Sequence, residues 1–111
     1  MEKIYNKLVR DNIPEIISND NRNPITRILS DEEYKNELEK KLLEEYNEVL
    51  ETSTSEERIE ELADMLEIIQ TLATLENKTL GDVIEVAKIK KLKRGGFEKK
   101  IFLERVLDVE A

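Results

Sequence analysis

The sequence contains no cysteine, no histidine and no tryptophan, and only 5% of its 111 residues are aromatic. Without cysteine and histidine, the chain has no disulfide bonds, no zinc site built on those residues, no thiol nucleophile and no histidine general base. It also lacks an apolar run long enough for a signal peptide or a membrane span, so we expect a cytoplasmic protein with no membrane partner. Carboxylates are the main side chains left for acid–base chemistry.

Charge is plentiful but unbalanced, since 26 acidic residues face 18 basic ones and the net charge is −8. No broad basic face offsets this excess, which disfavours nucleic acid as a partner. A small polyphosphate that arrives with its own metal ion remains compatible with it. The length of the chain predicts a single domain over residues 1–111.

The central stretch of the chain, residues 30–76, predicts an antiparallel helical hairpin. Its first helix, residues 30–51, opens with Ser30 and Glu33 in the spacing of a capping box. A short break at residues 52–54 separates it from a second helix, residues 55–76. A third helix is expected over residues 80–93, ended by Gly95 and Gly96. A short helix near Ile13 would be capped by Asp11.

Two further expectations complete a mainly α fold. Residues 25–29 and 99–107 alternate in a way typical of strands, and we expect them to pair as a small two-stranded β element. The second hairpin helix is apolar over most of its surface, which a single hairpin cannot cover. We therefore expect a homodimer, in which two hairpins complete a four-helix-type core.

Acidic residues stand at hairpin positions where the helical period predicts apolar ones. Glu45 falls inside the apolar arc of the first helix, and Glu48 lies at its edge. On the second helix, Glu61 projects among apolar side chains and Asp64 borders the polar strip. Each pair is spaced three apart and so shares a helix face, and an antiparallel hairpin can bring both pairs to one place.

Carboxylates gathered in an apolar seam need a counter-charge, because an unpaired buried carboxylate costs several kcal/mol. An oxygen-only ligand set suits a hard cation, Mg²⁺ or Mn²⁺. The alternative is that these are solvated surface charges paired with lysines, as most glutamates at such spacings are.

The apolar stripe of the third helix continues into basic residues at its last turn. Lys90 and Arg94, one turn apart, could point at an anion held with the metal. Basic residues are also favoured at helix C-termini by the helix dipole, and the two explanations are compatible.

Four segments of the chain resemble one known family. The motifs EEYNE (residues 44–48) and ELAD (61–64) resemble the EExxE…ExxD signature of the all-α nucleoside triphosphate pyrophosphohydrolases, the MazG-like superfamily. The segments YNKLVRDNIPEII (5–17) and KRGGFEKKIFLE (93–104) resemble its phosphoribosyl-ATP pyrophosphohydrolase-like branch. The chain departs from this pattern at Asn12, where relatives often have lysine.

The resemblance implies a dimer, or a dimer of dimers, that cleaves nucleoside triphosphates between the α and β phosphates with Mg²⁺. The implied metal ligands are Glu45, Glu48, Glu61 and Asp64. The implied phosphate-binding residues are Lys90, Arg94, Lys7 and Arg10. Glu44 matches the first acid of the motif, but the helical period turns it outward, so we expect it to support the ligands from outside the metal shell.

The predicted activity is therefore hydrolysis of a nucleoside triphosphate to the monophosphate and pyrophosphate, in nucleotide-pool house-cleaning. With no histidine in the chain, Glu45 or Glu48 is the expected general base. The alternatives are a non-catalytic nucleotide-binding module and a helical interaction protein on the same scaffold.

Overall fold

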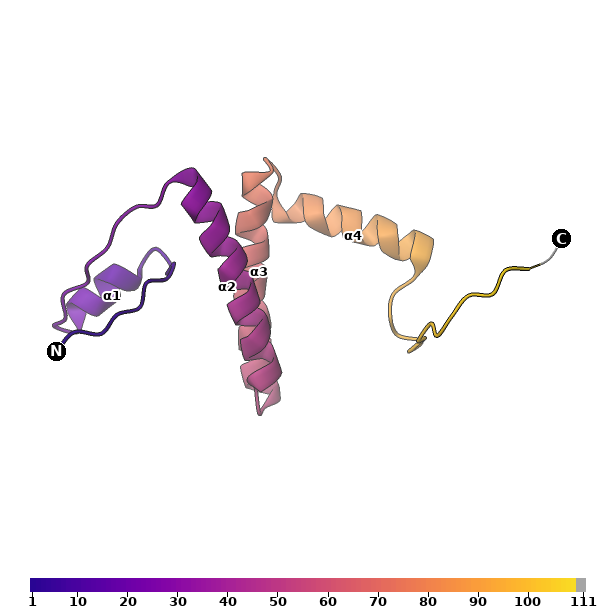
Figure 1. Ribbon diagram of the computed structural model, residues 1–111, viewed down its shortest axis with the longest axis horizontal. Helices are drawn as coiled ribbons and strands as arrows, with labels where there is room; N and C mark the ends of the chain where they lie inside the picture. Colours follow the sequence, from indigo (N-terminus) through magenta and orange to yellow (C-terminus); the bar gives the residue numbers. More distant parts are fainter. Residues whose placement is uncertain (110–111) are drawn as a thin grey trace. The chain divides into compact units, whose positions relative to one another are not determined.

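The computed structural model describes residues 1–109 and is mainly helical (Figure 1). In chain order, the helices are α1 (Ile13–Asn19), α2 (Asp31–Glu51), α3 (Ser55–Leu75) and α4 (Leu80–Arg94). The chain divides into two compact units, Met1–Thr79 and a second one that begins at Leu80. The single domain over residues 1–111 stays a prediction.

The hairpin of the first unit begins as predicted. Ser30 Oγ accepts a hydrogen bond from the Glu33 amide, and the Glu33 carboxylate accepts one from the Ser30 amide, which completes the capping box. Arg27 adds two hydrogen bonds to the same carboxylate, at 3.2 and 2.7 Å. At the second helix, Thr54 Oγ1 accepts from the Glu57 amide and caps α3. The break at residues 52–54 is confirmed.

Helices α2 and α3 pack against each other along the hairpin (Figure 1). The core between them is small. Within residues 1–109, the buried apolar side chains are Leu38, Val49 and Ala73. So few buried side chains supply little hydrophobic stabilisation, because each fully buried one contributes roughly 1.5–3 kcal/mol.

Large apolar side chains remain exposed on one side of this hairpin. They form two stripes, each with the i, i+3, i+7 spacing of one helix face: Leu43, Tyr46 and Leu50 on α2, and Ile59, Leu62 and Leu66 on α3. At about 100° per residue, both stripes lie on the same side of the hairpin, opposite Glu48 and Asp64. We call these six residues the apolar face.

The second unit contains α4, which begins at the predicted residue and ends one residue beyond the predicted end. Gly95 follows it with φ = +83°, a left-handed conformation that glycine adopts without strain. The predicted helix stop at this position is therefore confirmed.

Two local predictions are wrong. No strand forms in residues 1–109, so segments 25–29 and 99–107 do not make the expected β element. Ile25 and Ile28 are almost fully exposed, and a two-stranded ribbon without a surface to cover is marginal in water. The N-cap of α1 is Asn12 rather than Asp11, and it makes no side-chain capping bond.

One negative finding concerns the helices of the described part of the chain. None of them combines the length and the apolar composition that a membrane crossing needs.

Candidate metal centre

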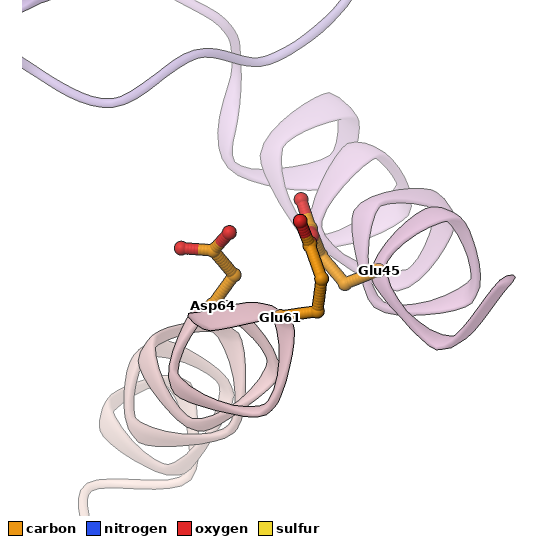
Figure 2. Close-up of side chains that lie close together, drawn as sticks. All are labelled: Glu45, Glu61 and Asp64. Atoms are coloured by element: carbon orange, nitrogen blue, oxygen red, sulfur yellow. The ribbon is translucent and has the colours of Figure 1, made fainter. Parts of the chain in front are cut away.

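Three acidic side chains of the hairpin lie close together (Figure 2). Glu45 comes from α2, whereas Glu61 and Asp64 come from one face of α3, three residues apart. Each offers a carboxylate oxygen, and these oxygens lie within 4.8 Å of one another. We call these residues the acidic triad. The antiparallel packing of α2 on α3 thus brings together acids that are well separated in the sequence.

Glu45 is the most enclosed member of the acidic triad. It is 6% exposed, because it occupies a core position of α2 between Leu38 and Val49. Its Oε2 atom is buried and has no hydrogen-bond partner, and the same holds for Oε2 of Glu61. Its nearest cation is Lys41, whose Nζ lies 3.9 Å from Oε1 of Glu45. Two buried carboxylate oxygens of the acidic triad thus lack a hydrogen-bond partner in this structure.

This environment favours the protonated form of the buried acids. Burial, then the charges of Glu48 and Asp64, raise the pKa of Glu45 to about 7. The pKa of Glu61 is also raised, first because a proton on Glu61 can be shared with Glu48 in a hydrogen bond, and then by burial. In the absence of a cation, the cluster therefore relieves its repulsion by holding a proton near neutral pH.

Glu48 adjoins the acidic triad without belonging to it. It is half-buried and lies within hydrogen-bonding reach of both Glu45 and Glu61. The sequence pattern predicted four converging carboxylates. The structure brings three of them within 4.8 Å and leaves Glu48 beside them.

Two cations of the segment before α1 reach this side of the hairpin. Arg10 Nη2 lies 2.7 Å from Oδ1 of Asp64, and Lys7 Nζ lies 3.4 Å from Oε1 of Glu44. Lys41 also approaches Glu44, at 3.8 Å. Glu44 therefore lies at the edge of the site, paired with lysines, which agrees with the outward position expected for it.

Nothing in the sequence predicted these two ion pairs. The family resemblance implied phosphate as the ligand of Lys7 and Arg10, whereas here they contact acidic residues of α2 and α3. The partners are 37 and 54 residues apart, so no helical period could have indicated the pairing.

The other predicted phosphate ligands, Lys90 and Arg94, lie on α4 in the second unit, and both are exposed. The expected role of these two residues in binding phosphate stays a prediction. Within the first unit, an open hollow adjoins the acidic triad at the turn end of the hairpin. Its lining is acidic apart from one threonine, and consists of Glu48, Glu51, Thr52, Glu57, Glu60 and Glu61. Such a wall repels a polyphosphate that carries no metal.

Comparisons of the chain with protein-family models, with curated proteins and with solved structures find no match.

Proposed function

We propose that this protein is a Mg²⁺-dependent nucleoside triphosphate pyrophosphohydrolase, which converts a nucleoside triphosphate and water to the monophosphate and pyrophosphate. The observation that carries the proposal is Glu45. A carboxylate 94% removed from solvent, with an oxygen that has no partner, faces two more carboxylates at a distance that one cation can bridge. The motif resemblance points to the same residues.

The donor set fits the ion. Mg²⁺ and Mn²⁺ prefer carboxylate oxygens, and the acidic triad offers three of them without nitrogen or sulfur ligands nearby. Glu45, Glu61 and Asp64 would hold the ion, with Glu48 beside them as a further ligand. When bound, the ion supplies charge neutralisation at the phosphate oxygens and a lower pKa for the attacking water.

The remaining chemistry falls to side chains of the chain itself. Glu48, within reach of two members of the acidic triad and more accessible than Glu45, accepts the proton of the attacking water, and Glu45 is the alternative base. Lys90 and Arg94 are proposed to stabilise charge on the departing pyrophosphate. Such a protein would act in the cytoplasm, where nucleoside triphosphates and Mg²⁺ occur together.

A homodimer is part of this proposal. The apolar face leaves large side chains such as Leu43 and Leu66 at 61% and 47% exposure, although the hairpin has few buried ones. A second copy that packs its own apolar face there would complete the four-helix core. Because this face lies opposite Glu48 and Asp64, packing would leave the acidic triad open to substrate.

The apolar face also favours the alternative, a non-catalytic helical interaction or nucleotide-binding protein. Measuring pyrophosphate release over a panel of nucleoside triphosphates, with Mg²⁺ and with a chelator, distinguishes the hydrolase from the non-catalytic alternative. We expect Mg²⁺-dependent release that is lost in Glu45→Gln. Glu39→Gln is the matched control, since it makes the same change at an exposed position of α2. Nucleotide binding without release by the wild type would favour the non-catalytic alternative.

A further inference from the structure

The segment before α1 places a positive charge on the acidic triad. The guanidinium of Arg10 contacts Asp64 at 2.7 Å, and the neighbouring Lys7 contacts Glu44 at 3.4 Å. In the view of Figure 2, the three carboxylates point toward the side on which this N-terminal segment passes. The acidic side of the hairpin thus already has an internal counter-ion.

This counter-ion is held weakly. The side chains of Arg10 and Asp64 are 58% and 40% exposed. Ion pairs between exposed side chains contribute little, because water and salt screen them and both side chains lose freedom. A divalent cation bound by several carboxylates interacts with each of them more strongly than one exposed guanidinium does.

We propose that the N-terminal segment is a cation-exchangeable strap. Arg10 neutralises Asp64 when the acidic triad holds no metal, and a divalent cation displaces it. This inference rests on the proposed metal site and adds its regulation. It has two consequences: Arg10 lowers the affinity of the acidic triad for the cation, and cation binding frees the segment around residues 7–10 from the hairpin.

The proposal also explains why one of the three acids has a cationic partner whereas buried oxygens of the other two have no hydrogen-bond partner. Arg10 reaches Asp64, which is half-exposed, whereas the buried oxygens of Glu45 and Glu61 keep no partner. An exposed guanidinium that contacts Asp64 leaves the enclosed oxygens without a partner, but a small ion can enter between them. The strap therefore leaves the strongest cation-binding positions available.

The test is Mn²⁺ binding to the full chain, measured by electron paramagnetic resonance of the free ion. We expect Arg10→Gln to bind Mn²⁺ about fivefold more tightly than the wild type, which corresponds to about 1 kcal/mol. Arg10→Lys, which keeps the charge, should bind close to the wild type. Arg22→Gln is the matched control, because Arg22 pairs with Asp20 away from the acidic triad.

A second measurement on the unaltered protein follows the release of the strap. Trypsin cleavage after Lys7 and Arg10 should accelerate severalfold on addition of Mn²⁺, while cleavage after Arg22 should not. Unchanged cleavage, or Mn²⁺ binding by Arg10→Gln that is equal to or weaker than that of the wild type, overturns the strap and leaves the metal site standing. Absence of Mn²⁺ binding in both proteins overturns the metal site itself, and the strap with it.

Discussion

Replacing Glu45 by glutamine should stabilise the metal-free protein at neutral pH. The change removes a charge from a position that is 6% exposed and keeps the size of the side chain. The new amide can donate hydrogen bonds to the carboxylates of Glu48 and Glu61, which now lie within reach of Glu45. A buried repulsion is thus replaced by a hydrogen bond.

The magnitude follows from the pKa of Glu45, which rises from 4.5 to about 7 on folding. Because the folded state binds the proton more tightly, stability falls as pH rises through this window. The linkage relation gives a cost of up to about 3 kcal/mol at pH 7, of which about 2 kcal/mol is recovered at pH 5. Glutamine at position 45 does not titrate, so it contributes no pH dependence to the unfolding free energy of the Glu45→Gln variant.

The assay is urea unfolding in the presence of a chelator, at fixed protein concentration, between pH 5 and pH 7.5. We expect the unfolding free energy of Glu45→Gln to exceed that of the wild type at pH 7 and to approach it at pH 5. Glu39→Gln controls for loss of one negative charge from α2. A Glu45→Gln variant that is less stable than the wild type at pH 7 would refute the argument that the buried charge of Glu45 destabilises the metal-free protein.

Three further outcomes are expected. Mg²⁺ or Mn²⁺ should raise the melting temperature of the wild type, because an ion that binds only the folded state stabilises it. The increase should be much smaller in Asp64→Asn. Thermal scans with and without chelator measure both effects. Ser30→Ala should cost about 1 kcal/mol in urea unfolding through loss of the α2 cap, compared with Ser18→Ala as a control outside the cap. Hydrogen bonds from Arg27 and Ser30 lower the pKa of Glu33 to about 2. The stabilisation that the ionised Glu33 gives the folded state should therefore disappear as pH falls from about 4.5 toward 2. Acid titrations of the unfolding free energy should show this loss in the wild type and not in Glu33→Gln.

Local signals in the sequence predicted the parts of this fold that local physics decides. The Ser30 cap, the break before α3 and the stop at Gly95 each depend on residues within one turn of the chain. The burial of Glu45 was also predictable, because a helix of regular period turns that position toward its neighbour whatever the residue.

Features that depend on distant parts of the chain were not predictable in this way. The alternation in residues 25–29 predicted a strand, but a strand needs a partner edge, which a sequence pattern cannot guarantee. The pairing of Arg10 with Asp64 depends on where the N-terminal segment returns to the hairpin, 54 residues along the chain. The sequence pattern indicated that acids of the two helices lie close together, and it gave no sign of the ion pair between Arg10 and Asp64.

The exposed apolar face and the acidic triad lie on opposite sides of the hairpin, and this leads to a final prediction. The hairpin has few buried apolar side chains, and in the proposed function a second copy covers the apolar face and a cation occupies the acidic triad. Leu66→Gln, a neutral change in the apolar face, should shift the protein toward monomer in sedimentation experiments and lower its stability. Thr74→Gln, at an exposed position of α3 that lies off the apolar face, is the control.

Because the two sides lie opposite each other, their contributions should be separable. Energetic effects of distant sites that share no partner add to within about 0.5 kcal/mol. The stabilisation by saturating Mn²⁺ should therefore be nearly the same in Leu66→Gln as in the wild type, when each is compared with its own chelated form. A Mn²⁺ effect that disappears with the dimer would instead mean that the partner copy completes the metal site, and that the acidic triad of one hairpin does not hold the ion alone.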